Sequence, residues 1–189
     1  MVKLLLAGTG LIGHRHMQHI LEHPDLELVG VIDPLIADEK IEGVKTYHSL
    51  NDVNNVAEGI ILATPTETHA DLTIQSLEMG LHVLVEKPVA ASLQEADKMI
   101  RASEKTGLSI LVGHHRRHHP LVNETINIIK SGKIGRPVAA SLMWLMRKQD
   151  EYFDVEWRKG IDGGPIKQNL IHDVDTVSYT HLRAHETSP

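Results

Sequence analysis

Short apolar runs alternate with segments of helical periodicity along most of the chain. The apolar runs lie at residues 2–6, 27–32, 59–63, 82–85 and 109–112. Segments with one apolar helical face lie at 12–21, at 69–78, and from a capping box at Ser92–Glu95 to Gly107. Short apolar strands that alternate with helices are typical of a parallel sheet covered on both faces. The pattern therefore predicts an α/β fold.

The pattern changes after residue 112. A helix is predicted over residues 121–130, where Ser131-Gly132 ends it. A longer strand is predicted from Val138 to about Met146, and its apolar positions alternate only loosely. Loose alternation indicates a sheet of a different character from the first one. We therefore expect a second structural region after about residue 120.

A glycine motif, Gly8-Thr9-Gly10-Leu11-Ile12-Gly13, follows the first apolar run and opens the first helical segment. In a dinucleotide-binding fold, Gly8 permits the tight turn, Gly10 lets the backbone approach a pyrophosphate, and Gly13 lets helix and strand pack closely. Free N–H groups at the helix start, at Leu11 and Ile12, would face the phosphates. An ordinary glycine turn is the alternative for this motif taken alone.

A carboxylate ends the second predicted strand. Asp33 follows Glu27–Ile32 and lies close to the ~20-residue spacing at which an acidic residue binds the ribose hydroxyls. No Arg or Lys follows immediately, since the next residues are Pro34-Leu35-Ile36. A carboxylate here would repel a 2′-phosphate, so NAD is favoured over NADP. The alternative is an ordinary aspartate.

A second motif, Glu86-Lys87-Pro88, closes the apolar run at residues 82–85. A lysine at the carboxyl end of a strand can reach a nicotinamide that lies across the strand ends. Together, the two motifs suggest a nicotinamide-dependent oxidoreductase. The alternative for Lys87 is a surface cation on a loop.

Composition narrows the function classes. The 189 residues carry a net charge of −6 and 3% aromatic residues, which argues against a nucleic-acid-binding surface. Cysteine is absent, which excludes disulfides and thiolate chemistry and suits a reducing cytoplasm. The run Leu4–Ala7 is too short for a signal-peptide core, and no segment approaches the ~20 apolar residues that cross a bilayer. We therefore expect a cytoplasmic protein with no membrane or nucleic-acid partner.

The last residues differ from the rest of the chain. Residues 177–187 have no hydrophobic period and do not continue the preceding pattern. Their sequence resembles the translated mosaic end and adapter of transposase-based sequencing libraries, and a polar C-terminal tail is the alternative. We therefore expect a gene product truncated near Thr176, with residues 177–189 forming a non-native tail that lacks stable packing.

Several motifs together resemble the Gfo/Idh/MocA oxidoreductases. They are Gly8–Gly13, Thr64-Pro65 followed by His69, Glu86-Lys87-Pro88, the segment 113–120, and Gly163-Gly164-Pro165 leading to His172. The match covers residues 1 to about 176, and Glu86-Lys87-Pro88 is its most specific element. The resemblance implies a Rossmann-type doubly wound parallel sheet at residues 1–120. It also implies that residues 121–176 are an incomplete α/β domain for substrate binding and oligomerisation, which begins a mostly antiparallel sheet.

The same resemblance implies hydride transfer between a nicotinamide cofactor and a hydroxyl or carbonyl of a sugar, cyclitol or similar small polyol. Lys87 would lie near the nicotinamide and the reacting carbon, and His172 would take the hydroxyl proton as general base. A histidine suits this task because its unperturbed pKa is about 6.5. A packing histidine is the alternative for His172. The resemblance also implies a cis Lys87-Pro88 peptide bond and a homo-oligomeric full-length protein.

Further site residues follow from the resemblance. On the cofactor side they are Thr64, Pro65, His69, Glu86 and Arg117, and on the substrate side they are Trp157, Arg158, Gln168 and Asn169. Many family members have an aspartate where this chain has Gln168, four residues before the catalytic histidine. Neither Gln168 nor Asn169 can act as a base, although either could orient His172 or hold a substrate hydroxyl. The substitution keeps open a non-catalytic nucleotide sensor or scaffold of the same fold.

The segment His114-His115-Arg116-Arg117-His118-His119 also suggests a metal site. On a helix, its histidines would form two i, i+4 pairs, each pair on one face. The two arginines would repel a cation, and Gly113 and Pro120 indicate a loop. We therefore predict no metal. Asp173 and Asp175, which follow the predicted base, are expected to be structural or orienting residues.

Overall fold

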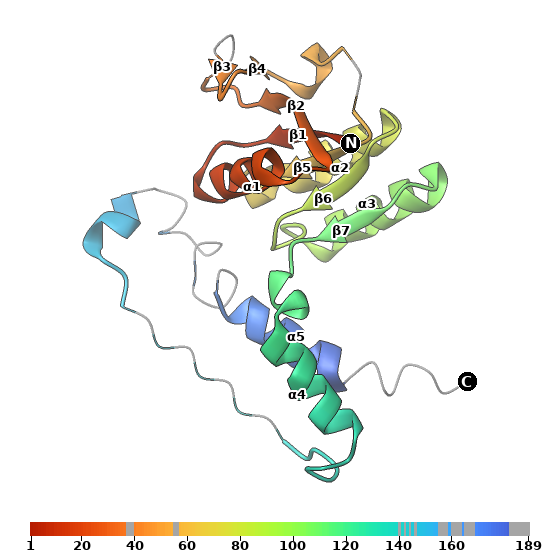
Figure 1. Cartoon of the computed structure of the whole chain (residues 1–189), viewed down its shortest axis with the longest axis vertical. Coiled ribbons are helices and arrows are strands. Elements are labelled where there is room, and N and C mark those ends of the chain that lie inside the picture. Colours follow the sequence, from red (N-terminus) through yellow and green to blue (C-terminus); the bar gives the residue numbers. More distant parts are fainter. Residues whose placement is uncertain are drawn as a thin grey trace. The chain divides into compact units, whose positions relative to one another are not determined.

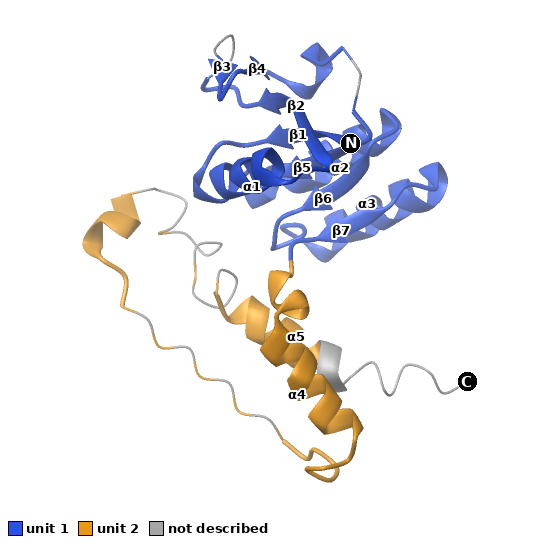
Figure 2. Cartoon of the chain, in the orientation of Figure 1, with its two compact units in different colours: residues 1–113 blue, residues 114–189 orange. Residues whose placement is uncertain are grey.

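The computed structural model forms two compact units, residues 1–113 and 114–189 (Figure 2). The structure describes residues 1–36, 40–54, 57–139, 141, 143, 145, 147–154, 159, 164 and 169–181. The first unit ends directly after the last strand of its sheet, and each unit is described by itself below.

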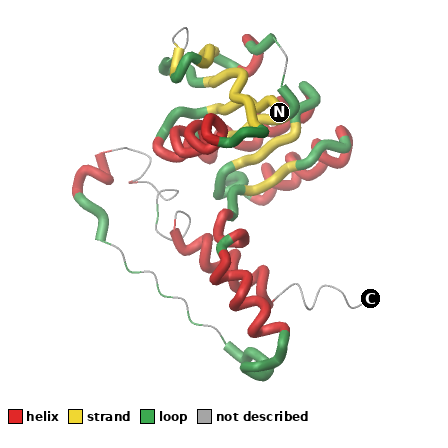
Figure 3. The backbone as a smooth tube through the Cα atoms, viewed as in Figure 1, coloured by secondary structure: helices red, strands yellow, loops and turns green. Residues whose placement is uncertain are grey.

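The first unit is built on a seven-stranded sheet (Figures 1 and 3). Its strands are β1 (Val2–Ala7), β2 (Leu26–Ile32), β3 (Lys40–Ile41), β4 (Val44–Tyr47), β5 (Gly59–Leu62), β6 (His82–Val85) and β7 (Ile110–Val112). They lie in the order β3-β4-β2-β1-β5-β6-β7, and all neighbours are parallel except β3 and β4. Without β3, this is the strand order of the doubly wound dinucleotide-binding fold. The predicted Rossmann-type sheet is confirmed.

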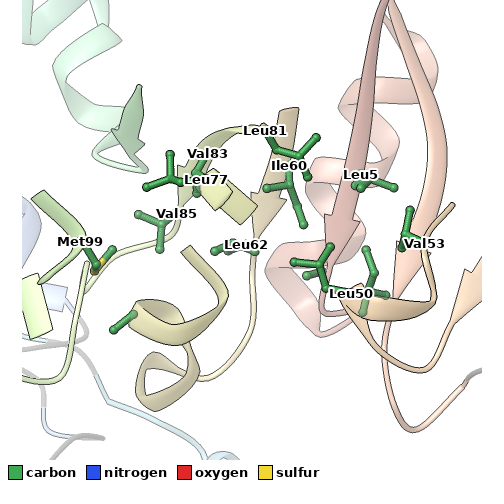
Figure 4. Packing of buried hydrophobic residues seen from close by; sticks show 13 residues of the cluster. Leu5, Leu50, Val53, Ile60, Leu62, Leu77, Leu81, Val83, Val85 and Met99 are labelled. Atoms are coloured by element: carbon green, nitrogen blue, oxygen red, sulfur yellow. The ribbon is translucent and has the colours of Figure 1, made fainter. Parts of the chain in front are cut away.

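Helices cover both faces of this sheet. Successive residues of a strand point to opposite faces, and both sets of side chains are apolar here, so each face packs against helices. On one face, Leu5 and Ile60 belong to the same core cluster as Leu77 of α2 (His69–Glu78) and Met99 of α3 (Leu93–Thr106) (Figure 4). On the other face, Leu6, Val31 and Ile61 pack with Met17 and Ile20 of α1 (Leu11–Glu22). Consecutive strand residues are therefore both buried, as in Leu5/Leu6 and Ile60/Ile61. This explains why the strands are continuous apolar runs in the sequence.

The predicted capping signals of α3 are present. The Ser92 side chain accepts a hydrogen bond from the Glu95 N–H at 3.2 Å, and the Glu95 carboxylate accepts one from the Ala91 N–H at 2.9 Å. Gly107 follows the last helical residue in the left-handed conformation, with φ at 71°. The local sequence thus determines both ends of this helix.

A short hairpin and one 3₁₀ turn lie between β2 and β5 and were not predicted from the sequence. Strand β3 has two residues, and the turn to β4 has positive φ at Glu42 and Gly43. The 3₁₀ helix η1 (Leu50–Asp52) starts with a capping box in which Ser49 and Asp52 bond to each other. Leu50 brings this segment into the main core.

The described part of the second unit is helical. Its elements are η3 (His115–His118), α4 (Pro120–Lys130), η4 (Asp150–Asp154) and α5 (Ile171–His181). Helix α4 matches the predicted helix, and it contacts α5 and η3. Helix α5 was not predicted, and it continues through Val177 to His181, where the sequence indicated a tail. The origin of residues 177–189 stays a prediction.

The strand predicted from Val138 to about Met146 is wrong for the positions that the structure describes. Residues 138, 139, 141, 143 and 145 lie in none of the strands, and Val138 and Leu145 are highly exposed. A strand needs a neighbouring strand to bond its N–H and C=O groups. Within the described residues of this unit no such neighbour is present, so the apolar alternation alone does not produce a sheet.

Across the described residues, no helix combines the length and the apolar character needed to cross a bilayer.

Candidate functional site

The carboxyl ends of the parallel strands carry the glycine motif, Asp33 and the Glu86-Lys87-Pro88 motif. Backbone N–H groups just past these ends donate to the carbonyls of neighbouring strands. The bonds are Gly8 N to Ile32 O, Glu86 N to Leu62 O and Gly113 N to Val85 O, at 2.8–2.9 Å. In the sheet, β2 and β4 follow β1 on one side, and β5, β6 and β7 follow it on the other, so the strand order reverses at β1. In open α/β sheets, ligands bind at this reversal of the strand order.

The glycine loop is tightly packed at two of its three glycines. Gly8 has φ at +90°, and a Cβ there would lie 2.5 Å from Ala63 O. A Cβ on Gly13 would lie 2.0 Å from Gly8 O, because the first turn of α1 presses against the loop. Gly10 is exposed and a Cβ there would meet nothing within 4 Å. This packing is compatible with the three predicted glycine roles, in which a phosphate approaches the open position, and those roles stay a prediction.

Helix α1 begins directly at the loop, and its first residues face solvent. Leu11 is 71% exposed and Ile12 is 38% exposed. The N–H groups of a first helical turn have no partner within the helix, and the helix dipole adds partial positive charge there. The geometry therefore leaves room for an anionic phosphate, and the cofactor contacts of Leu11 and Ile12 stay a prediction.

Asp33 is buried directly after β2 and is bonded to the glycine loop. Its Oδ2 accepts the Thr9 N–H at 3.0 Å and the Thr9 hydroxyl at 2.5 Å, and its Oδ1 accepts the Leu35 N–H at 3.0 Å. Burial raises the pKa of Asp33, but the hydrogen bonds from Thr9 and Leu35 outweigh it and lower the pKa below its usual value. The carboxylate stays charged and retains further acceptor capacity. Thr9 is a site residue that the sequence did not single out.

Glu86 and Lys87 extend from the carboxyl end of β6. The Lys87-Pro88 peptide bond is cis, so that prediction is confirmed, and Lys87 is half-buried. Glu86 accepts a hydrogen bond from His16 Nε2 of α1 at 2.8 Å and one from the Lys87 N–H at 3.2 Å. Burial raises the pKa of Glu86, but His16 and Lys87 together lower it below its usual value. A Cβ on Gly113 would lie 2.9–3.1 Å from the Glu86 carboxyl group, so glycine leaves room for it.

His69, predicted on the cofactor side, is 1% exposed at the start of α2. Its Nδ1 lies 2.9 Å from Pro88 O, and its Nε2 lies 2.9 Å from Thr64 O. Thr64 is half-buried and accepts a hydrogen bond from the Thr68 hydroxyl at 2.7 Å, while Pro65 is exposed. The buried His69 ring thus lies between the loops after β5 and β6 and can donate a hydrogen bond to the carbonyl of either loop.

In the second unit, three histidine rings lie together. His172, the predicted base, is 7% exposed on α5. Its ring centroid lies 4.6 Å from that of His115 and 6.4 Å from that of His114, both in edge-to-face arrangements. A neutral imidazole in such a cluster can accept a proton from a hydroxyl group.

Two ion pairs join η3 to α5 beside this cluster. Arg116 pairs with Asp173, and Arg117 pairs with Asp175 through two guanidinium nitrogens. Burial raises the pKa of Asp175, but the Arg117 hydrogen bond and the charges of His114, Arg117 and His172 lower it below its usual value. Asp173 and Asp175 are therefore structural partners of the arginines. The cofactor contact predicted for Arg117 stays a prediction.

Part of the predicted substrate side lies outside the described residues. These positions are Trp157, Arg158 and Gln168, while Asn169 is half-buried just before α5. Among the described residues, no three or more His, Asp or Glu side chains gather in an arrangement able to hold a metal ion. The segment with the histidine pairs forms a 3₁₀ turn, so the helical i, i+4 geometry does not arise there.

A family model matches residues 2–114, more than half of the chain. Its description is "Oxidoreductase family, NAD-binding Rossmann fold" (GFO_IDH_MocA). The matched residues contain the glycine motif, Asp33 and Glu86-Lys87-Pro88, and they end at the boundary of the first unit.

Individual relatives agree with this match. The 4-carboxy-2-hydroxymuconate-6-semialdehyde dehydrogenase of Sphingobium sp. (strain NBRC 103272 / SYK-6) is 32% identical over 94% of this chain and 58% of its own length. The scyllo-inositol 2-dehydrogenase (NAD(+)) of Bacillus subtilis is 32% identical over 72% of this chain and 42% of its own. The WlbA dehydrogenase from Bordetella pertussis, solved with NADH and UDP-GlcNAcA, superposes with a TM-score of 0.83 at 27% identity, over 95% of this chain and 55% of its own. The chain spans about half the length of these relatives.

Proposed function

This chain belongs to the oxidoreductase family with an NAD-binding Rossmann fold, and we propose that the protein transfers hydride between a nicotinamide cofactor and a hydroxyl or carbonyl of a small polyol or sugar. The observation that carries the proposal is the placement of Lys87. It extends from the carboxyl end of β6, on the same side of the sheet as the glycine loop and Asp33. A dinucleotide bound at the glycine loop lies across these strand ends.

The first unit fits a dinucleotide cofactor on structural grounds. Gly8 and Gly13 keep the loop close to the sheet and to α1, and Gly10 leaves its outer side open. Asp33 remains a carboxylate where the ribose would bind, and Leu35 beyond it is 91% exposed and uncharged. We therefore propose NAD as the cofactor, since a 2′-phosphate would meet the Asp33 charge without a cation beside it in the described residues.

The proposed reaction divides between two side chains of the chain. Lys87 would place its positive charge near the oxygen on which negative charge develops, and so stabilise that oxygen. His172 would take the proton from the substrate hydroxyl as the carbonyl forms. A nicotinamide held at this site would accept the hydride, and in the reverse reaction His172 would return the proton to the substrate oxygen.

Relatives support a polyol or sugar substrate. One of them is named for scyllo-inositol and NAD(+), and another was solved with NADH and a nucleotide sugar. Trp157, Arg158, Gln168 and Asn169 remain our predicted substrate-side residues. We further propose that the whole protein is a cytoplasmic homo-oligomer, which sedimentation analysis and cell fractionation would test.

Calorimetric titration of the chain with NAD and with NADP tests the cofactor assignment. We expect tighter binding of NAD, and equal or reversed affinities would contradict the role of Asp33. NADH formation with a panel of inositols and sugars, measured on the full-length protein, tests the reaction. Lys87→Ala should lower kcat by about 10²-fold while NAD affinity is nearly unchanged, since one charge-stabilising donor is lost. Tight NAD binding without turnover on any polyol would favour the sensor or scaffold.

A further inference from the structure

We propose that two histidines, His16 and His69, position Lys87 by fastening the Glu86-Lys87-Pro88 segment from opposite faces of the sheet. The inference rests on the proposed function of Lys87. His16 lies on α1, which covers one face, and His69 lies on α2, which covers the other. Neither needs to touch cofactor or substrate, so both are positioning residues.

His16 acts through the carboxylate before Lys87. Its Nε2 donates to Glu86 Oε1 at 2.8 Å, and the side chains of His16 and Glu86 are 22% and 15% exposed. The other carboxylate oxygen of Glu86 accepts the Lys87 N–H. The Glu86 carboxylate therefore couples α1 to the backbone of Lys87 itself. Its lowered pKa keeps it charged, and a charged acceptor makes the stronger hydrogen bond.

His69 acts on the residue after Lys87. Its Nδ1 lies 2.9 Å from Pro88 O and its Nε2 lies 2.9 Å from Thr64 O. The His69 residue itself is 1% exposed. Both partners are carbonyl oxygens, so a singly protonated ring donates to one of them, and both hydrogen bonds form together only when both ring nitrogens carry a proton. The ring therefore lies between the loop after β6 and the loop after β5, beside the reversal of the strand order, and the nitrogen that carries the proton decides which loop it bonds.

The two contacts together restrain the segment on both sides of Lys87. Glu86 is held toward α1 and Pro88 is held toward α2, so the Cα of Lys87 is fixed between two anchored neighbours. A flexible lysine side chain has four rotatable bonds, and precise placement of its ammonium depends on a fixed backbone. A misplacement of about 1 Å can cost on the order of 10²-fold in rate.

The first experiment compares substitutions on α1. His16→Leu removes the donor, and His16→Gln returns an N–H donor at a reach similar to that of Nε2. His19 lies exposed on the same helix, so His19→Leu is the matched control. In the active protein we expect His16→Leu to lower kcat by about 10-fold to 100-fold with the KM for NAD nearly unchanged. His16→Gln should recover most of the loss, and His19→Leu should match wild type.

The second experiment tests which contact of His69 matters, the one with Pro88 O or the one with Thr64 O. Asn places its amide nitrogen near the position of Nδ1 and so can still bond Pro88 O, whereas Gln reaches toward Thr64 O. If the Pro88 bond positions Lys87, His69→Asn should retain more kcat than His69→Gln at similar thermal stability. Should neither variant fold, the His16 series decides the proposal.

The outcomes distinguish this inference from the proposed function. A wild-type protein without dehydrogenase activity would contradict the function itself. An active wild type whose kcat is unaffected by His16→Leu would overturn the positioning role while leaving the function intact. Two other results would also overturn it. One is a fall in kcat in His16→Leu that His16→Gln does not recover, and the other is an effect of His16→Leu on the KM for NAD in place of kcat.

Discussion

Gly13→Ala is the substitution for which the structure makes the sharpest prediction. A Cβ at this position would lie 2.0 Å from Gly8 O and 2.9 Å from Gly8 C. Separations under 3.0 Å are essentially never seen for real Cβ atoms, so the loop and helix α1 would have to move apart by about 1 Å. Both colliding groups are backbone, and neither can rotate away as a side chain could.

The size of the effect follows from opposing terms. Overpacking of this kind typically costs about 1–3 kcal/mol, and two rigid backbone segments place Gly13→Ala at the upper end or above it. Alanine recovers about 1 kcal/mol in a helix because glycine is the poorer helix former. We expect a net loss of about 2 kcal/mol or more in the free energy of unfolding, together with weaker NAD binding because the loop is displaced.

Gly10→Ala is the matched control in the same motif. A Cβ there meets nothing within 4 Å, and Gly10 has φ at −64°, which alanine adopts without strain. Its loss of stability should stay within about 1 kcal/mol, the scale of an N-cap change. NAD affinity should fall nevertheless, since the added methyl group lies where the pyrophosphate must approach.

Urea unfolding followed by far-ultraviolet circular dichroism measures the stability term, and NAD titration measures the binding term. The unfolding midpoint should fall clearly for Gly13→Ala and little for Gly10→Ala, with similar m-values. If the free energy of unfolding of Gly13→Ala lies within about 0.5 kcal/mol of the wild-type value, the reasoning is refuted, because ordinary surface substitutions have effects of that size.

Three further predictions concern the first unit. Leu62→Ala removes a side chain that is fully buried, and should lower the free energy of unfolding by about 2–5 kcal/mol in denaturant titrations. Ser92→Ala removes the N-cap acceptor of α3 and should cost about 1 kcal/mol, with increased hydrogen exchange at the Glu95 N–H. The lowered pKa of Glu86 means that its stabilisation is complete above the usual glutamate value of about 4.3 and is lost as pH falls through the lowered value. Unfolding experiments from pH 7 downward should therefore show a shallower acid loss in Glu86→Gln than in wild type, and identical profiles would contradict the assignment.

Much of the first unit could be predicted because its determinants are local. Apolar runs marked the strands, and Ser92, Glu95 and Gly107 marked the ends of α3. The glycine motif and Asp33 also carried their spacing in the sequence. The hairpin of β3 and β4 escaped prediction because a two-residue strand has no measurable alternation.

The contacts that complete the candidate site could not be read from spacing. His16 and Glu86 lie 70 positions apart, and Arg117 and Asp175 lie 58 apart, so only folding brings them together. The strand predicted near residue 140 failed for a related reason, because alternation reports which face is apolar and does not supply a pairing partner.

The position of β1 at the centre of the sheet also has a consequence for how the chain folds during synthesis. Leu4 pairs with Leu28 of β2 on one side and with Gly59 of β5 on the other. A ribosome adds about 5–20 residues per second, so the second partner follows the first by about 2–6 s. During that interval one edge of the strand that leads into the glycine loop is open to pairing with other chains. Until β5 emerges, nascent chains should therefore depend on chaperones to keep this edge from pairing with other chains.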